Sequence, residues 1–271
     1  MQAREQELVD FPVRRYVSES DVFVKDHKFT SKECCLDITL NGAPLTSSFC
    51  SPGDHADLVT GILAQMGKIR TADDIVRLSI DEENLTAEVE TTEEAQAFAA
   101  KAAEDPRYYR ARDILACDPE KIFERPRDVR FVAKDILATA DHLLGILAAT
   151  HEKTNGVHSG VLFDQKKREI LVFREDIGRH NVFDKLYGWA LRHHIDITDK
   201  LIVFSGRCSS EMMMKLGRMG VAAVAAKSVP TTLSLRLAQK LGITLCARMA
   251  PGSFCIYTHP ERIVLRDEAG I

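Results

Sequence analysis

The sequence predicts an α/β protein with a smaller N-terminal α+β domain. Two observations carry this prediction. Strand and helix patterns alternate through the second half, as they do in open sheets with crossover helices. The first half contains two hairpin signals instead. The 271 residues, 45% of them hydrophobic, suffice for two cores. We therefore expect one domain at 1–125, ending in a mobile cysteine-bearing loop, and an α/β domain at 126–271.

The first half begins with β-structure. Residues 20–50 alternate between apolar and polar side chains, and Asn41-Gly42 predicts a tight hairpin turn between two strands. Asp54 is a candidate N-cap for a helix that runs to about Gln65. These patterns predict a small antiparallel sheet followed by a helix.

A second hairpin and a second helix follow. The hairpin is expected from the apolar alternation of 76–80 and 85–89, and the helix lies within 91–109, where Asp105-Pro106 ends or bends it. Residues 104–130 contain three prolines among many charged side chains. We expect this segment to be a long connecting loop.

The second half predicts alternating strands and helices. A helix is expected at about 128–151, and the first two strands, 160–163 and 169–173, form a hairpin. The later strands are predicted at 201–205, 221–226 and 243–247, and the helices at 179–193, 211–219 and 230–241. This order is βαβαβ with mainly parallel connections. Of the consecutive methionines 212–214, one or two must face the core.

Composition excludes several classes of protein. The net charge of −4 and the pI near 6.2 give no general basic field for DNA. The sequence contains no apolar run of about 18 residues, and its charged first ten residues do not resemble a signal peptide. We expect a cytoplasmic protein that neither spans a membrane nor binds duplex DNA.

The seven cysteines do not form a regular metal-binding pattern. None forms a C-x-x-C pair, and the zinc deaminase pattern of H-x-E followed by P-C-x-x-C is absent. An odd number of cysteines without regular spacing is typical of reduced thiols. The sequence therefore does not signal a metal site.

A charged run marks the predicted functional site. Residues 174–181 combine two arginines, two acids, a glycine and a histidine, which suits an anionic ligand better than a solvated loop. Arg207 and Ser209 follow a predicted strand at the start of a helix, where backbone N–H groups bind anions. An ordinary serine cap is the alternative there, and capping is the preferred interpretation of 228–232.

Other candidates lie after strands. The Pro-Gly turn at 248–253 could close over a flat heterocycle, or it could be a plain hairpin turn. His158, His180 and His259 each lie near a glycine or proline rather than on an apolar face, and we expect them to converge in one crevice. Asp184 and Lys185 are interpreted as a surface pair. The histidines could act as acid, base or hydrogen-bond donor.

Cys117 lies in the long loop, with basic residues on either side of it. A thiol in an accessible basic segment has a lowered pKa and can exchange sulfur with another protein. That property is what a persulfide carrier needs, although a chance unpaired thiol would look the same.

Several of these motifs together resemble one family, the FdhD/NarQ formate dehydrogenase accessory proteins. The resemblance is densest in the second half and weaker at Cys50-Ser51-Pro52, Leu58, Gly61 and Ile62. The matching motifs are 154–158, 174–181 with Asp184-Lys185-Leu186, Ser205-Gly206-Arg207, Ser210-Glu211-Met212, Pro230-Thr231-Thr232 and 256–260.

The resemblance implies a sulfurtransferase with a cytidine deaminase-like three-layer fold that lacks the deaminase zinc. Such a protein takes persulfide sulfur from a cysteine desulfurase. It passes the sulfur to the molybdenum bis(molybdopterin guanine dinucleotide) cofactor, or its tungsten analogue, for the formate dehydrogenase catalytic subunit. A homodimer is also implied.

The resemblance also assigns residues. Cys117 stands at the position of the family's loop cysteine. Residues 248–253 stand where the family contacts the cofactor. Together with the candidates named above, the positions expected to bind the cofactor are His158, Arg174, Asp176, Arg179, His180, Arg207, Ser209, Arg248, Met249, Ala250, Pro251, Gly252, Ser253, Tyr257 and His259. The family's C-G-x-C-G loop motif is reduced here to Cys117-Asp118-Pro119. A cofactor-binding chaperone that performs no covalent sulfur chemistry is therefore the alternative, and nucleoside deamination ranks last.

Overall fold

The computed structural model of the chain describes residues 8–116, 128–151 and 156–265. Its largest sheet has six strands, in the order β13-β12-β11-β10-β8-β9. The strands are β8 (His158–Asp164), β9 (Glu169–Asp176), β10 (Leu201–Phe204), β11 (Ala223–Ala226), β12 (Thr244–Ala250) and β13 (Ser253–Thr258). The expected boundary at 125/126 lies outside the described residues.

The middle of this sheet is parallel and its edges are antiparallel. Strands β10, β11 and β12 run parallel, as the βαβαβ pattern predicted, whereas β8, β9 and β13 are antiparallel to their neighbours. All four residues of β10 are at most 1% exposed. A strand that is buried on both faces is a continuous apolar run, which explains why no alternation appears at 201–204.

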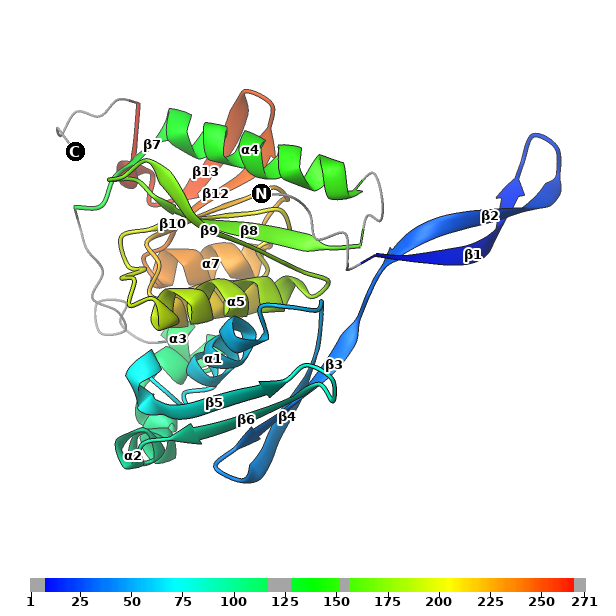
Figure 1. Ribbon diagram of the computed structural model, residues 1–271. Helices are drawn as coiled ribbons and strands as arrows, with labels where there is room; N and C mark the ends of the chain where they lie inside the picture. The colour runs from blue at the N-terminus through cyan, green and yellow to red at the C-terminus, as the bar shows by residue number, and fades with distance from the viewer. Residues whose placement is uncertain (1–7, 117–127, 152–155, 266–271) are drawn as a thin grey trace.

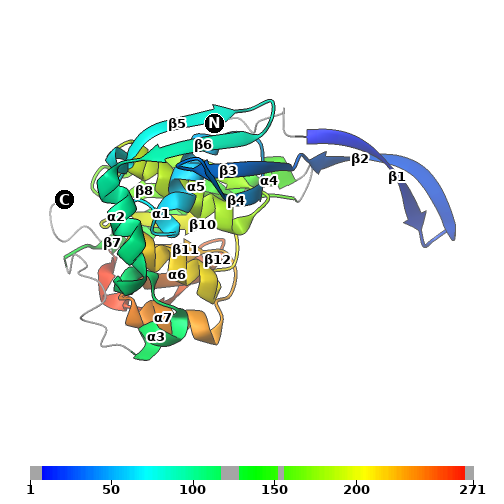
Figure 2. The same cartoon turned by 90° about the horizontal axis from the view of Figure 1, so that it is seen from below.

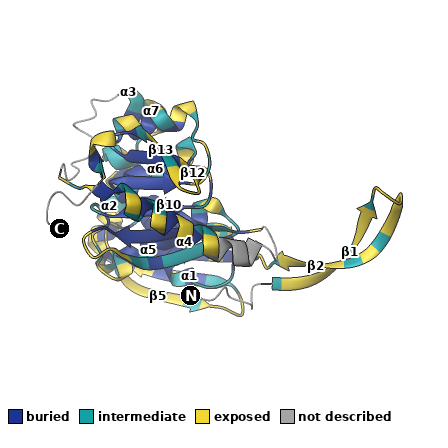
Figure 3. Cartoon of the chain, turned by 90° about the horizontal axis from the view of Figure 1, so that it is seen from above, coloured by how far each residue is buried: buried dark blue, intermediate teal, exposed yellow. Residues whose placement is uncertain are grey.

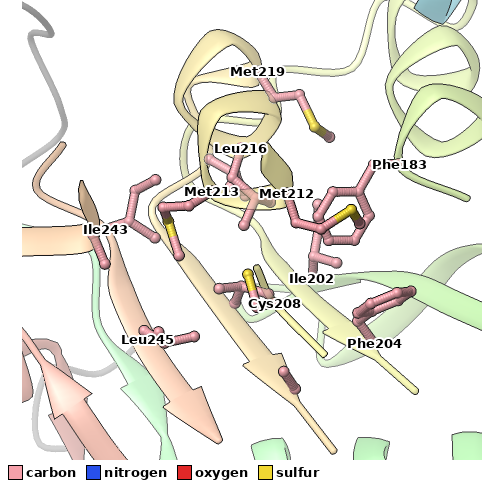
Figure 4. Close-up of a cluster of buried hydrophobic side chains, with 14 of the residues drawn as sticks. Phe183, Ile202, Phe204, Cys208, Met212, Met213, Leu216, Met219, Ile243 and Leu245 are labelled. Carbon is pink, nitrogen blue, oxygen red and sulfur yellow. The ribbon is translucent and has the colours of Figure 1, made fainter. Parts of the chain in front are cut away.

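Helices cover both faces of the six-stranded sheet (Figure 1). Helix α4 (Ala133–His151) lies on one face, where Ile136 packs with Val203. On the other face lie α5 (Arg179–Arg192), α6 (Ser210–Met219) and α7 (Thr232–Lys240). Met212 and Met213 point into the core from α6 (Figure 4), and Met214 is buried in the same core, so the prediction that methionines face the core is confirmed.

The N-terminal half forms a second, four-stranded sheet in the order β4-β3-β6-β5. Its strands are β3 (Cys34–Leu40), β4 (Ala43–Cys50), β5 (Ile75–Asp81) and β6 (Thr86–Thr91). Both predicted hairpins are confirmed, and Asn41 and Gly42 have the positive φ angles of 51° and 78° that the tight turn requires. The sheet is mixed rather than antiparallel, because β3 pairs parallel with β6.

Short helices accompany and follow the N-terminal sheet. Helix α1 (His55–Gln65) packs on the four-stranded sheet, and α2 (Glu93–Lys101) begins at the capping side chain of Thr92. Two 3-10 turns, η3 (Ala102–Glu104) and η4 (Pro106–Tyr108), lead to α3 (Ala111–Ala116). The expected loop at 104–130 therefore contains a helix, whose Ile114 is buried in the larger core.

A two-stranded arm leaves the body of the molecule (Figure 2). It consists of β1 (Leu8–Val17) and β2 (Val22–Ser31), which pair with each other. Most of its residues are exposed (Figure 3), including Phe11, Phe23 and Phe29. The alternation predicted for residues 20–50 thus belongs to two separate β-structures.

Helices α1 and α5 cross at two glycines. A Cβ on Gly61 would lie 1.9 Å from the backbone oxygen of Asp184, and a Cβ on Gly188 would lie 1.8 Å from that of Asp57. Real Cβ atoms do not approach an oxygen this closely, so glycine is required at both positions. The two helix backbones are in direct contact, and this contact joins the two halves.

Small elements complete the fold. A 3-10 turn, η2 (Ala72–Asp74), precedes β5, and another, η6 (Pro260–Arg262), follows β13. Strands β7 (Phe131–Val132) and β14 (Ile263–Val264) form a short parallel pair. Within the described part of the chain, every helix is too short or too polar to cross a membrane.

Candidate functional site

Basic side chains gather at one edge of the six-stranded sheet. This edge lies at the carboxyl ends of β10, β11 and β12, where open α/β sheets bind their ligands. The exposed residues Arg207, Lys227 and Arg248 follow or end these strands, and Arg179 begins α5 at the same edge. We call Arg179, Arg207, Lys227 and Arg248 the basic edge.

The basic edge extends across several strands of the sheet. Arg248 lies on β12 and Arg179 follows β9, which is four strands away in the sheet order. Neighbouring strands are about 4.8 Å apart, so the two positions are separated by roughly 20 Å. In the described residues, neither Arg207 nor Arg248 forms an ion pair with a carboxylate. The edge therefore has uncompensated positive charge in a chain of net negative charge.

The loop after β10 is shaped by Gly206. A Cβ there would lie 2.7 Å from the Phe204 ring and 3.1 Å from Nδ1 of His158, so only glycine lets the backbone pass this closely over the histidine. The next residue of the sheet, Ser159, donates its backbone N–H to Oγ of Ser205 at 2.8 Å. His158 is thus fixed beneath the loop that carries Arg207, as the sequence predicted.

Ser209 occupies the N-cap position of α6, but its hydroxyl does not cap the helix. Its Oγ is buried and has no hydrogen-bond partner among the described residues. Buried polar atoms are nearly always bonded, so an unpartnered hydroxyl at the start of α6, two positions after Arg207, is unusual. The alternative of an ordinary serine cap is wrong here. At α7, by contrast, Thr231 and Ser234 form a capping box, which confirms the capping interpretation.

His180 lies in the first turn of α5, with its Nε2 3.4 Å from a carboxylate oxygen of Glu211. Burial lowers the pKa of His180, and the cations Lys215 and Arg179 lower it further. The imidazole is therefore neutral around pH 7. A neutral imidazole at the basic edge can accept a proton or donate a hydrogen bond to a ligand.

Arg174 does not reach the basic edge, contrary to the prediction. Its Nε and Nη2 donate to Oδ2 of Asp57 at 3.0 and 2.6 Å, and its Nη1 donates to the carbonyl of Phe173. Arg192 donates to the other oxygen of Asp57 at 2.6 Å. Asp54 occupies the N-cap position of α1, and the helix ends at Gln65, as predicted. The Asp54 side chain makes no capping hydrogen bond and lies 3.7 Å from Arg174. Arg174 instead holds α1 to the larger sheet.

Asp176 is also structural, because its fully buried carboxylate is occupied by protein donors. Oδ1 accepts from the backbone N–H of Gly178 and from Asn181, and Oδ2 accepts from the backbone N–H of Ser51 at 3.1 Å. Lys185 pairs with Oδ2 at 2.7 Å. A cofactor would have to displace these donors, so the structure contradicts the assignment of Asp176 to cofactor binding.

The predicted surface pair of Asp184 and Lys185 is wrong, because each side chain pairs with a different residue. Lys185 is buried and bonds Asp176, while Asp184 bonds Nζ of Lys215 at 2.5 Å. Burial raises the pKa of the Asp184 carboxyl, and Lys215 opposes that rise. Adjacent residues on a helix point in different directions, so the two cannot face each other.

His259 lies at the opposite edge of the sheet, so the predicted convergence of three histidines is wrong. Strand β13 is antiparallel to β12, and Thr258 pairs with Leu245 near the start of β12. His259 contacts the carbonyl of Gln239, and Tyr257, one position before Thr258, packs against the larger core. Only His158 and His180 lie at the basic edge.

The turn at 248–253 is the tip of the β12–β13 hairpin. Arg248, Ala250, Pro251, Gly252 and Ser253 are exposed, whereas the side chain of Met249 is buried in the core beside α4. The plain hairpin interpretation describes its shape. Any contact of Met249 with a ligand would use its backbone, and the cofactor-binding role of the tip stays a prediction.

Cys117 lies outside the described residues, which end at Ala116 of α3 and resume at 128. Of the described cysteines, Cys208 and Cys246 are buried, and burial raises the pKa of each thiol to about 12. Cys255 is exposed on β13. The predicted role of Cys117 as a persulfide carrier is therefore untested by the structure.

The structure also brings together three residues that sequence reasoning missed. Cys34 and Cys50 face each other across β3 and β4, with their Sγ atoms 3.6 Å apart, and Nε2 of His55 lies 3.7 Å from Sγ of Cys34. All three side chains are buried. Burial raises the pKa of both thiols. The only signal in the sequence is that the Asn41-Gly42 hairpin places Cys34 and Cys50 close in register.

Fold and site define an α/β protein with a basic edge at the ends of its central strands. Its N-terminal sheet is joined to the larger half by the glycine contact of α1 with α5. The chain belongs to the FdhD/NarQ family, whose model matches residues 31–264. It is 37% identical over 264 residues to a sulfur carrier protein FdhD of Geobacillus kaustophilus, covering 94% of this chain and 96% of the relative. The protein of that name from Bacillus subtilis is 36% identical, with 93% and 95% covered.

A solved structure shows the same fold. The crystal structure described as a formate dehydrogenase accessory protein from Desulfotalea psychrophila superposes with a TM-score of 0.77 at 22% identity. The superposition covers 95% of this chain and 99% of that one. The two proteins therefore share the same mixed α/β fold.

Proposed function

We propose that this protein is a sulfur carrier that serves a formate dehydrogenase. It takes sulfur from a cysteine desulfurase as a persulfide on Cys117. It passes that sulfur to molybdenum bis(molybdopterin guanine dinucleotide), or the tungsten analogue, held at the basic edge. The names of its relatives support the sulfur carrier role, and the basic edge supports an anionic cargo.

The observation that carries the proposal is the unpartnered hydroxyl of Ser209, two positions after Arg207 at the start of α6. The buried hydroxyl of Ser209 lacks a partner in the described residues, and Gly206 keeps the loop open where a Cβ would collide with Phe204. Arginine, hydroxyl and open helix N–H groups together are the donor set that binds a phosphate. A guanine dinucleotide carries several phosphates, and Arg248 and Arg179 are placed to meet others.

The proposed chemistry at Cys117 is a thiol–persulfide exchange. The Cys117 thiolate attacks the outer sulfur of the desulfurase persulfide, the S–S bond breaks, and the desulfurase thiolate leaves. No net oxidation occurs. The neutral imidazole of His180 and the ring of His158 lie at the edge where the second transfer would take place.

The binding half of the proposal is tested with Arg207→Ala and GDP as the probe ligand. If Arg207 makes a charged hydrogen bond to phosphate, its loss should cost about 1.5–3 kcal/mol, or roughly 10- to 150-fold in Kd. Isothermal titration calorimetry measures the change. Arg77→Ala is the matched control, because Arg77 is exposed on β5 in the other sheet. An Arg207→Ala affinity equal to that of the control would refute the assignment.

The sulfur half is tested by mass spectrometry after incubation with a cysteine desulfurase and cysteine. A gain of about 32 Da on the peptide that contains Cys117 is expected, and it should be absent in Cys117→Ser. If the sulfur appears on another cysteine, or on none, Cys117 is not the carrier.

A cofactor-binding chaperone is the second candidate function. The observation in its favour is that the segment around Cys117 has one cysteine where the family motif has two, so a two-thiol relay cannot form. The chaperone would deliver the cofactor to the dehydrogenase without covalent sulfur chemistry. Intact nucleotide binding together with no persulfide on Cys117 would select this function.

Further properties follow from the family resemblance. We propose that the larger half has the cytidine deaminase-like fold without the deaminase zinc and that residues 1–125 and 126–271 are its two domains. A homodimer, contact with the catalytic subunit of formate dehydrogenase and a cytoplasmic location are proposed on the same ground. Sedimentation of the purified chain would test the dimer.

A further inference from the structure

We propose that Cys34, Cys50 and His55 form a zinc site in the N-terminal sheet, with Glu82 orienting the histidine. Cys34 begins β3, Cys50 ends the neighbouring strand β4, and His55 is the first residue of α1. Three separate elements thus bring their ligand atoms together. The site lies far along the chain from Cys117 and is independent of the proposed sulfur transfer.

Two of the three distances between ligand atoms match tetrahedral coordination. With Zn–S bonds of about 2.3 Å and Zn–N bonds of about 2.05 Å, two sulfur ligands lie roughly 3.8 Å apart and a sulfur–nitrogen pair roughly 3.6 Å apart. The Cys34 and Cys50 sulfurs are 3.6 Å apart, and Nε2 of His55 is 3.7 Å from the Cys34 sulfur. All the ligand atoms lie within 4.8 Å of one another. A metal ion would need only small side-chain movements.

Glu82 forms a hydrogen bond with the second ring nitrogen of His55. Its Oε2 lies 2.7 Å from Nδ1 of His55, so the imidazole carries its proton on Nδ1 and turns the lone pair of Nε2 toward Cys34. This carboxylate–histidine arrangement is the one that zinc ligands usually have. A purely structural buried histidine would be expected to direct Nε2 at a stronger partner than a thiol.

The local charge also suits a dication. Zinc with two thiolates and one neutral imidazole has no net charge, which keeps the cost of burial low. The charged neighbours that act on the cysteines are Lys185 and Asp176, which neutralise each other, and Lys32. Binding releases two thiol protons and involves no oxidation. A water molecule or an added thiol would complete the fourth position, as in zinc sites with three protein ligands.

The experiment is metal analysis of the full-length protein purified under reducing conditions, followed by titration with Co²⁺. About one zinc per chain is expected, and Co²⁺ should give thiolate charge-transfer absorption. Both signals should be lost in Cys34→Ser and kept in Cys255→Ser and Cys117→Ser, which remove thiols outside the cluster. Glu82→Gln leaves all three ligands in place and changes an exposed residue, so this variant should still fold. Its zinc Kd should rise roughly 10- to 100-fold.

Three results would overturn the proposal. One is a wild-type protein that neither retains zinc nor gives the Co²⁺ spectrum. Another is equal metal binding by Cys34→Ser and Cys255→Ser. The third is a Cys34–Cys50 disulfide in metal-free protein that persists under the reducing conditions, which would make the pair a redox site. If Cys34→Ser does not fold, the Glu82→Gln affinity decides the question, and an unchanged Kd there counts against the site.

Discussion

Replacing Lys185 with methionine should destabilise this protein strongly, because it leaves a buried carboxylate without its cation. Lys185 has a side chain that is 1% exposed, and its Nζ lies 2.7 Å from Asp176, whose side chain is 0% exposed. Methionine keeps the length and most of the volume of lysine. The substitution therefore removes the charge with little change in packing.

The size of the effect follows from what stays around Asp176. Removing one partner of a buried ion pair typically costs 3–5 kcal/mol. The donors from Ser51, Gly178 and Asn181 still satisfy the carboxylate, so the lower end is expected, about 3 kcal/mol. Domains of ordinary stability have about 5–15 kcal/mol in total. The variant should fold, but with a clearly reduced margin.

Urea denaturation measures the change, with the fluorescence of the single tryptophan, Trp189 on α5, and circular dichroism as two probes. Coincident transitions justify a two-state treatment. The control is Lys166→Met, which removes a 68% exposed lysine from its pair with Asp199 and should cost less than about 1 kcal/mol. The double variant Asp176→Asn/Lys185→Met should recover part of the loss. A single-variant loss no larger than the control's would refute the reasoning.

Three further predictions concern other parts of the chain. Gly188→Ala should lower the melting temperature by many degrees or prevent folding, because its Cβ would meet the backbone of α1. Gly145→Ala, at an exposed position of α4, should instead stabilise the protein by about 0.5–1 kcal/mol. The pKa of His180 is lowered on folding, so the unfolded state binds the proton more readily and the stability should fall as the pH drops below about 6.5. NMR titration of the ring should give a midpoint below that value, and His180→Gln should flatten the pH dependence of the melting temperature. Iodoacetamide should modify exposed Cys255 quickly and buried Cys208 only after unfolding, and peptide mass spectrometry that finds both modified in the native protein would contradict the burial.

The hairpin at Asn41-Gly42 shows both the reach and the limit of sequence reasoning. The turn type requires positive φ at two positions, and Asn-Gly satisfies this, so the hairpin was predictable. Strict pairing from that turn would place Cys34 opposite Phe49. A shift of register between Ile38 and Thr39, near Pro44 on the other strand, places it opposite Cys50 instead. A one-residue bulge is not visible as a pattern, so the cysteine pair was not predictable.

The charged run at 174–181 predicts a ligand site, but only part of the run lies at the basic edge. Arg179 and His180 lie at the basic edge, as predicted. Arg174 and Asp176 instead bind Asp57 and Ser51, which lie 117 and 125 positions earlier in the chain. Ligand binding and attachment of a distant segment require the same kinds of side chain. A single sequence does not separate the two uses.

The position of His259 depended on the direction of one strand. The sequence predicts a Pro-Gly turn at 248–253 that could be a plain hairpin turn, and the convergence of His259 with the other histidines does not take that hairpin into account. The short Pro251-Gly252 turn forces an antiparallel return, which carries His259 to the opposite edge of the sheet. A turn this short cannot join parallel strands, because they need a long crossover.

The contact of α1 with α5 determines when, during synthesis, the N-terminal half can complete its fold. The guanidinium groups that neutralise Asp57 lie 117 and 135 positions after it. At about 5–20 residues per second, a ribosome needs roughly 6 to 27 seconds to make that stretch. During this interval the nascent chain exposes the glycine face of α1 and an unpaired Asp57. The N-terminal half therefore cannot complete its contacts until α5 has been synthesised.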